Sequence, residues 1–207
     1  MDTIPIIRQI DSDNSCLFNA FSYVYDKNNH NDSSSLVLRN IIAQVISQNP
    51  IKYNTSFLGK SNPEYQEFII NPKKWGGAIE LSILSDYFSV QICTFDIQSL
   101  KRHCFGESID YQDRVYLLYN GTHYDALVMS MDKALSTDFD ITKFSPNDNS
   151  IAEKFYKLVV ELHSNGQYTA LANLILLCND CNTILKNTEE AVKHAKITGH
   201  TNMEQIK

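Results

Sequence analysis

The spacing of apolar residues divides the chain into a helical amino-terminal part, a strand-rich middle and a separate carboxyl-terminal module. In the first part, apolar side chains recur every three or four residues, which predicts amphipathic helices that each bury one face. Polar residues, prolines and glycines interrupt this pattern where helices are expected to end. The predicted helices occupy residues 17–25, 62–71 and 79–88, together with a helix whose apolar stripe covers 38–46. The serines before that stripe are expected to cap it, Asn49-Pro50 to end it, and Asn62 to cap the helix at 62–71.

The middle of the chain has the periodicity of β-strands. Residues 115–119 are apolar without interruption, as expected of a central strand that is buried on both faces. Asn120-Gly121 then predicts a hairpin turn, after which the chain returns as a strand. The predicted strands are residues 4–10 (a strand or an extended segment), 90–97, 102–105, 115–119 and 123–129.

After these strands the sequence becomes polar. Residues 132–150 carry alternating Asn and Asp together with Pro146, which predicts a linker. A helix follows, capped by Asn149 and ending near Gly166, and His163 is expected to be a surface residue of its last turn.

Composition and charge narrow the class of protein. The chain has 207 residues, of which 43% are hydrophobic and 20% charged, as is typical of globular proteins with one ordinary domain and an appendage or two modest domains. A net charge of -6 argues against general binding to nucleic acid or anionic membrane, because both favour basic surfaces. The sequence shows neither a signal peptide nor a membrane span, so a soluble intracellular protein is expected.

The use of cysteine supports the same expectation. Cys16, Cys93 and Cys104 are scattered along the chain, and we expect no disulfide framework among them. Cys93 is predicted to be a buried strand residue and Cys104 a structural or surface residue.

The first candidate for chemistry is the polar loop at residues 11–15, which leads into a predicted helix with Cys16 at the junction. Unpaired amide groups and the positive end of the helix dipole favour a thiolate there, and the same amides can receive an oxyanion. A nucleophile needs these properties. The alternative is a small buried cysteine at the start of a core helix, and this stretch alone does not separate the two.

A glycine-rich stretch is the second candidate. Gly76 and Gly77 stand beside Trp75, the only tryptophan of the chain. Two adjacent glycines allow either a tight turn or the close approach of another backbone, so both a turn and a binding platform fit these residues.

The third candidate is His123-Tyr124-Asp125. Residues two apart on a strand point to the same side, so Asp125 can fix the tautomer of the His123 imidazole and stabilise its charged form. A cysteine, a histidine and a carboxylate are the parts of a thiol protease or thioesterase. The alternative is a solvated histidine beside a turn.

The carboxyl-terminal module has the spacing Cys-x2-Cys-x12-His-x5-His, which is typical of a two-Cys, two-His zinc site. Asn187 and Glu190 predict a capping box for the helix that carries the first histidine, and Gly199 ends that helix. We therefore expect a ββα finger with structural zinc and with residues 174–177 as its first strand. Acidic residues open the helix where a DNA-reading finger has basic ones, so a protein-binding finger is favoured. The predicted ligands are Cys178, Cys181, His194 and His200.

Together, four motifs resemble the ovarian-tumour (OTU) family of deubiquitinating cysteine proteases, in its ubiquitin thioesterase branch that ends in a two-Cys, two-His finger. They cover nearly the whole chain in the expected order: residues 13–18 (DNSCLF), 75–80 (WGGAIE), 120–125 (NGTHYD) and 193–201 (KHAKITGHT). The resemblance implies an α+β fold, in which a small central β-sheet lies between helices, followed by the finger. It implies an OTU catalytic domain at residues 1–130, a linker and helix at 131–170, and the zinc finger at 171–207.

The resemblance also implies the roles of individual residues. Cys16 would be the nucleophile and His123 its general base and then acid, with Asp125 or Asp13 as the third catalytic member. Residues that would contact the ubiquitin tail are Asn14, Ser15, Trp75, Gly76, Gly77, Glu80 and Tyr124.

The implied activity is hydrolysis of isopeptide bonds at the carboxyl-terminal glycine of ubiquitin, in polyubiquitin chains or conjugates. Zinc would be a structural cofactor, with none needed for catalysis, and the expected location is the cytoplasm, with the nucleus as a second compartment. Relatives often carry an amino-terminal ubiquitin-like domain that docks on the hexameric AAA ATPase segregase of ER-associated degradation. Because this sequence begins almost at the OTU core, it is expected to be a piece of a longer protein or to lack that contact.

Two other functions are the competing hypotheses. In the first, the finger makes the protein a ubiquitin-binding adaptor, and the OTU core is weak or inactive. The second is a zinc-finger protein that binds nucleic acid, which the acidic charge balance disfavours.

Overall fold

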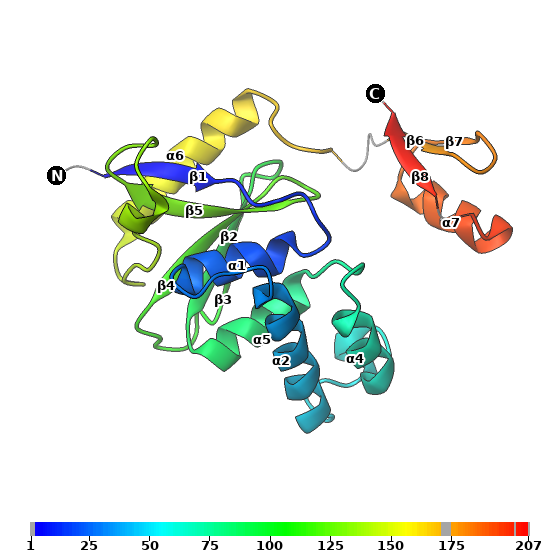
Figure 1. Ribbon diagram of the computed structural model, residues 1–207, viewed down its shortest axis with the longest axis horizontal. Coiled ribbons are helices and arrows are strands. Elements are labelled where there is room, and N and C mark those ends of the chain that lie inside the picture. Colours follow the sequence, from blue (N-terminus) through cyan, green and yellow to red (C-terminus); the bar gives the residue numbers. More distant parts are fainter. Residues whose placement is uncertain (1–2, 171–174, 201, 207) are drawn as a thin grey trace.

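The computed structural model describes residues 3–170, 175–200 and 202–206. Its larger part is built on a five-stranded sheet with the strand order β1-β5-β4-β2-β3 (Figure 1). Strands β2 and β4 are parallel, and the other neighbouring pairs are antiparallel. The strands are β1 (Ile4–Arg8), β2 (Gln91–Asp96), β3 (Arg102–Phe105), β4 (Arg114–Tyr119) and β5 (Tyr124–Ser130).

Helices cover both faces of this sheet. Figure 1 shows α1, α2 and α5 on one face and α6 on the other. The helices are α1 (Cys16–Asp26), α2 (Ser34–Gln48), α3 (Thr55–Leu58), α4 (Asn62–Ile70), α5 (Ala78–Phe88) and α6 (Asn149–Ser164), with the 3-10 helix η1 (Thr137–Phe139). The layered α+β fold expected from the sequence is therefore confirmed. None of the helices in the described part of the chain has the length and apolar character needed to cross a bilayer.

Strand β4 shows why the sheet holds two hydrophobic cores. Val115 and Leu117 belong to the cluster shared with α1, α2 and α5. Tyr116 and Leu118 point the other way and belong to the cluster shared with α6. Because both faces of β4 are covered, its sequence is a continuous apolar run rather than an alternating one.

The predicted helices and strands all form, but two helix caps differ from the expectation. Helix α4 is capped by Ser61 instead of Asn62, through a box in which the backbone and hydroxyl of Ser61 both donate to the carboxylate of Glu64. Helix α6 is capped by Asp148 instead of Asn149, because the Asp148 side chain accepts from the amide of Ser150 at 2.9 Å. The short helix α3 was not expected, because four residues are too few to show a helical period.

Residues 132–148 are not the free linker that their polar composition predicts. Ile141 pairs with Met129 of β5, and Phe144 pairs with Arg114 of β4 through reciprocal backbone hydrogen bonds. The segment therefore folds back along the sheet, and α6 belongs to the same core as β2, β4 and β5.

The expectation that the scattered cysteines stay unpaired is wrong for two of them. Cys93 of β2 and Cys104 of β3 form a disulfide, and they lie opposite each other in the register of the two antiparallel strands. Strand register decides this pairing, and register is not visible in the spacing of cysteines along a sequence.

The finger is a three-stranded sheet with one helix. Its elements are β6 (Ile175–Cys178), β7 (Ile184–Leu185), α7 (Thr188–Thr198) and β8 (Met203–Ile206), and the strand order is β7-β6-β8. Asn187 caps α7 by accepting from the amide of Glu190, and Gly199 ends it in a left-handed conformation, as predicted. The other half of the predicted capping box differs, because the Glu190 carboxylate accepts from the amide of Lys186 at 2.8 Å. Strand β8 was not expected, and the predicted strand residue Leu174 lies outside the described residues.

A buried carboxylate anchors the segments on either side of the loop at residues 11–15. Asp140 accepts two hydrogen bonds from the guanidinium of Arg8 in β1, both at 2.8 Å, and one from the hydroxyl of Tyr23 in α1 at 2.5 Å. Its own backbone carbonyl accepts from Lys27 at 2.7 Å. Burial opposes ionisation of Asp140, but the hydrogen bonds from Arg8 and Tyr23 outweigh it and hold the pKa of this carboxyl below its ordinary value.

We predict that Asp140→Asn lowers the free energy of unfolding by about 3 kcal/mol at neutral pH, because it leaves the charge of Arg8 without its partner. Since the folded pKa of Asp140 is depressed, its contribution is present above the ordinary aspartate pKa and is lost as the pH falls through the folded value. Urea denaturation at several pH values should therefore show the gap between wild type and variant closing on acidification. Asp138→Asn, at an exposed site two residues away, is the matched control; a gap independent of pH would contradict the assignment.

Candidate active site

The loop before α1 is organised by Asp13. Its carboxylate accepts from the amide of Ser15 at 2.7 Å and from the side-chain amide of Asn19 at 3.4 Å. The amide of Asp13 itself donates to the carbonyl of Asp11. Asp13 is exposed, and these hydrogen bonds make it the residue that holds the loop in shape.

Cys16 is the first residue of α1, as predicted, and it is a free thiol that is 8% exposed. Burial raises the pKa of the Cys16 thiol, while backbone hydrogen bonds of Tyr124 and Leu17 lower it less. The net shift is upward, so the helix start alone does not produce the thiolate that the sequence led us to expect. The contact with Tyr124 places the thiol against the beginning of β5, between His123 and Asp125 in the sequence.

The predicted pairing of His123 with Asp125 is present. Nε2 of His123 lies 3.1 Å from Oδ1 of Asp125, and both side chains are largely buried, at 16% and 18% exposure. The same oxygen of Asp125 accepts from the amide of Ile10 at 2.9 Å. The carboxylate is thus fixed from two sides, and it in turn orients the imidazole.

Cys16 opens onto a small slot of about 110 Å³. Tyr119 and Tyr124 form one wall, with their rings 4.6 Å apart, and the Tyr119 hydroxyl donates to the carbonyl of Gly121. The slot has room for a chain without bulky side chains. It is lined by Asn14, Cys16, Leu17, Trp75, Gly76, Gly77, Tyr119, Thr122 and Tyr124.

A wider cavity of about 530 Å³ shares Tyr119 and Tyr124 with this slot. Its remaining walls come from β2, β3 and the start of α5, and they include the carboxylate residue Asp96. We call the slot and this wider cavity, which both border the tyrosine pair, the channel.

Arg39 of α2 joins the two loops that border the slot. Its guanidinium donates to the carbonyls of Asn14 at 3.0 Å and Lys74 at 2.7 Å, and to the hydroxyl of Ser15 at 3.1 Å. It also donates to the carbonyls of Ile69 and Asn71. The side chain is fully buried and lies 4.1 Å above the ring of Phe18.

Residues 75–77 differ in exposure and role: Trp75 lies at the surface, whereas Gly76 and Gly77 are held by contacts within the protein. Trp75 is 58% exposed and donates from its indole nitrogen to the side-chain oxygen of Asn14 at 2.6 Å, so it extends the slot at the surface. A Cβ atom at Gly76 would lie 2.8 Å from the ring of Phe18, so only glycine fits there. Gly77 donates from its amide to the carboxylate of Glu80 at 2.6 Å.

Glu80 differs from the role that was expected for it. It is 2% exposed and accepts from the Tyr65 hydroxyl as well as from Gly77, and burial raises its pKa. A carboxylate in this position holds the start of α5 through the amide of Gly77. Ser15 is likewise buried, at 7% exposure, and contacts Arg39 instead of the slot.

The four predicted zinc ligands come together in the finger. Their ligand atoms lie within 4.8 Å of one another, and Sγ of Cys181 is 3.4 Å from Nε2 of His194. Two cysteine sulfurs and two imidazole nitrogens within this distance are the donor set that zinc prefers, so these residues fit the ion. They are Cys178, Cys181, His194 and His200.

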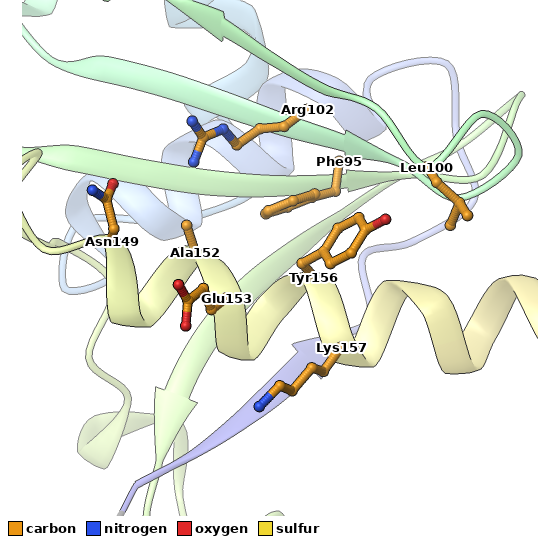
Figure 2. Close-up of a pocket in the computed structure, with 8 residues that line it drawn as sticks. All are labelled: Phe95, Leu100, Arg102, Asn149, Ala152, Glu153, Tyr156 and Lys157. Carbon is orange, nitrogen blue, oxygen red and sulfur yellow. The ribbon is translucent and has the colours of Figure 1, made fainter.

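A second groove, of about 500 Å³, lies on the α6 face of the sheet (Figure 2). Phe95 and Tyr156 form its apolar part, and Arg102, Glu153 and Lys157 carry charges of both signs. It contains none of the residues predicted to act in catalysis, so the candidate active site is the slot at Cys16.

The sequence did not single out Arg39 or Tyr119 for the site. Arg39 is one basic residue within the apolar stripe of a helix, and Tyr119 is one of the apolar run of β4. An arginine inside a core-facing stripe is nevertheless a signal, because a guanidinium is almost never fully buried without several acceptors.

Comparison with known proteins agrees with this geometry. Residues 11–130 match the model of the OTU-like cysteine protease family, and residues 172–206 match that of the carboxyl-terminal C2H2-type zinc finger of ubiquitin thioesterase OTU1. The chain is 46% identical to ubiquitin thioesterase OTU1 of Dictyostelium discoideum over 97% of its own length, and it spans 61% of that relative. It is 43% identical to the ovarian tumor domain-containing deubiquitinating enzyme 2 of Arabidopsis thaliana over the full length of both chains.

Solved structures show the same fold. An ovarian tumour domain in complex with ubiquitin is 30% identical and superposes with a TM-score of 0.70 over 81% of this chain and 92% of that one. The Hazara virus OTU bound to ubiquitin superposes with a TM-score of 0.51 at 21% identity, over 60% and 81% of the two chains. The chain therefore belongs to the OTU family of cysteine proteases, in the branch that ends in a C2H2-type finger.

Proposed function

We propose that this protein hydrolyses isopeptide bonds at the carboxyl-terminal glycine of ubiquitin. The observation that carries the proposal is the His123–Asp125 pair beside a Cys16 thiol that opens onto a slot fit for glycine. Relatives named ubiquitin thioesterase and a ubiquitin-bound structure of 30% identity support the choice of substrate.

In the proposed mechanism, His123 takes the proton of Cys16, and the sulfur attacks the carbonyl carbon of the terminal glycine. The C–N bond to the lysine amine then breaks, and His123 returns the proton to that amine. Water attacks the thioester with His123 as base, which releases ubiquitin and restores the thiol. Nε2 of His123 is held by Asp125, so Nδ1 is the nitrogen assigned to the proton transfers.

Burial of Cys16 makes its thiolate depend on His123. Because the pKa of Cys16 is raised, the charged imidazolium of His123 has to stabilise the thiolate once it forms. Alignment of His123 by Asp125 is therefore more important than the helix start. Asp13 serves a different purpose, because its hydrogen bonds keep the amides of the loop in place.

We assign the oxyanion to the amides of Asn14 and Cys16. The amides of Asp13 and Ser15 already donate within the loop, whereas the bond from the amide of Cys16 to the Asp13 carbonyl is long, at 3.4 Å. Donors aimed at the position of the developing charge stabilise it without reorganisation.

The channel supports a tail that ends in small residues. Gly76 and the tyrosine pair narrow the path at the thiol, and the wider cavity beyond them accepts larger side chains. Asp96 and Arg102 give that cavity charges of both signs, and the Asp96 carboxylate already accepts from the amide of Gln98 and the hydroxyl of Ser99, each at 2.8 Å.

We also propose that the protein works in the cytoplasm. If this chain is part of a longer protein with a ubiquitin-like docking domain, that protein would act beside the AAA ATPase segregase of ER-associated degradation.

The first prediction concerns the nucleophile. A ubiquitin probe with a carboxyl-terminal electrophile should label Cys16, and Cys16→Ala should abolish both labelling and cleavage of di-ubiquitin. Ser12→Ala, at an exposed position of the loop before Cys16, is the matched control and should keep the labelling. Cleavage by Cys16→Ala at the wild-type rate would refute the proposed function, and binding of ubiquitin without cleavage by the wild type would favour the adaptor.

The second prediction separates the two aspartates. Asp125→Asn should lower kcat by about 10²-fold to 10⁴-fold with little change in KM, because the imidazole loses its charged partner. Asp13→Asn keeps an acceptor for the Ser15 amide and should cost roughly tenfold or less. Steady-state kinetics on a fluorogenic ubiquitin substrate measures both, and a larger loss for Asp13→Asn would reverse the assignment.

The third prediction concerns zinc. Purified protein should carry one zinc ion per chain, and a His194→Ala, Cys181→Ser double variant should lose it because two ligands are missing. Elemental analysis after gel filtration measures the content. Asp180→Asn, in the turn between the two cysteines, is the control and should retain the metal; equal zinc in the double variant would exclude this site.

A further inference from the structure

The segment that follows α6 is fastened to the end of that helix. The amide of Gln167 donates to the carbonyl of Leu162 at 3.0 Å, and the ring of Tyr168 stacks on His163 with the centroids 5.2 Å apart. His163 in turn donates from Nδ1 to the carbonyl of Ile97 at 2.8 Å. His163 is thus half-buried and links α6 to the end of β2, instead of being the surface residue that was expected. We call residues 166–169 the strap.

The strap lies against the hairpin that carries His123. The amide of Thr169 donates to the carbonyl of Asn120 at 2.7 Å. A Cβ atom at Gly121 would come within 2.3 Å of the Thr169 carbonyl oxygen, so the two backbones approach as closely as glycine allows. Gly121 also has a positive φ of 107°, which glycine adopts without strain.

Asn120, which the strap contacts, is also hydrogen-bonded to the backbone of His123. Its side-chain oxygen accepts from the amide of His123 at 2.9 Å and from the amide of Thr122 at 3.1 Å. Its own amide donates to the carbonyl of His123 at 3.1 Å. The position of Asn120 therefore fixes the backbone of His123, from which the imidazole reaches Asp125.

The protein core does not fill this side of the hairpin. Asn120, Asp125 and residues 167–169 line one cavity of about 850 Å³, together with residues of β1 and α6. On this side the hairpin is held by its direct contacts with the strap at Asn120 and Gly121.

We propose that the strap is a positioning element of the active site and that Thr169, acting through Asn120, sets the alignment of His123 with Asp125 and Cys16. The inference rests on the proposed function of His123 as the base. Its consequence is that the catalytic unit extends through residue 169, well beyond the 11–130 segment that matches the family.

The test compares two substitutions of Thr169 in the full, zinc-loaded chain. Thr169→Pro removes the amide hydrogen that Asn120 accepts, whereas the conservative variant Thr169→Ala keeps the amide and the carbonyl. We expect Thr169→Pro to lower kcat on a fluorogenic ubiquitin substrate about tenfold or more with KM within about twofold, because a small misplacement of a reacting group is costly. Thr169→Ala should restore kcat to near the wild-type value.

The pH profile of Cys16 alkylation by iodoacetamide is the second readout, which a purely structural role would leave unchanged. If His123 is misaligned, its imidazolium stabilises the thiolate less, and the profile of Thr169→Pro shifts to higher pH. Neither variant alters the titratable groups that surround the thiol, which are Asp13, Arg39, Tyr119, His123, Tyr124 and Asp125.

An unchanged kcat and pH profile in folded Thr169→Pro would overturn the inference, as would an equal loss in Thr169→Ala. Should Thr169→Pro fail to fold, Tyr168→Ala is the second variant, because it removes the ring that stacks on His163 and holds the strap in place. We expect a smaller shift of its alkylation profile to higher pH. An unshifted profile in Tyr168→Ala also overturns the inference. If the wild type does not cleave ubiquitin, the proposed function fails, while the alkylation profiles still decide whether the strap positions His123.

Discussion

The buried guanidinium of Arg39 is the interaction on which the arrangement of the site depends. Its donors reach carbonyls that precede Cys16 and carbonyls that precede Trp75, two loops separated by some sixty residues of sequence. The two terminal nitrogens of the planar fork meet these acceptors at once, while Nε has no hydrogen-bond partner among the described residues. A lysine ammonium has neither the reach nor the geometry to do the same. Because α2 carries Arg39 in its buried stripe, the packing of that helix sets the distance between the nucleophile and the channel wall.

Phe18 connects the guanidinium of Arg39 to the wall of the slot. The ring lies under Arg39 on one side, and Gly76 packs against it with no room for a Cβ atom. The hydrogen bond from Trp75 to Asn14 closes the arrangement at the surface. The slot is therefore one rigid assembly, and a change in any of these contacts alters its width at the thiol.

The sequence was sufficient wherever the deciding contacts are local. Helix stripes, the hairpin at Asn120-Gly121 and the pairing of His123 with Asp125 depend on residues a few positions apart, and all are present. Their spacing also placed the four finger residues together. Capping residues were missed by one position, because adjacent polar residues have nearly the same propensity to cap.

Features that the sequence did not predict depend on contacts between segments that are far apart along the chain. The resemblance to the OTU family implied that Glu80 contacts the ubiquitin tail, yet its carboxylate is buried and accepts from the hydroxyl of Tyr65, fifteen residues earlier. Cys93 and Cys104 pair because of strand register, and the polar stretch around Asp140 folds back because Arg8 and Tyr23 meet its carboxylate there. Polar composition alone does not distinguish a solvated loop from one with a buried anchor.

The two sides of the active site are supported in different ways. The nucleophile loop is held at Asn14 and Ser15 by the buried guanidinium of α2, whereas the hairpin of His123 borders a cavity of about 850 Å³ and meets the strap at Asn120 and Gly121. Because burial raises the pKa of Cys16, the thiol depends on its histidine to become reactive. The hairpin that carries His123 therefore controls the reactivity of Cys16. Small displacements of this hairpin should have large effects on catalysis.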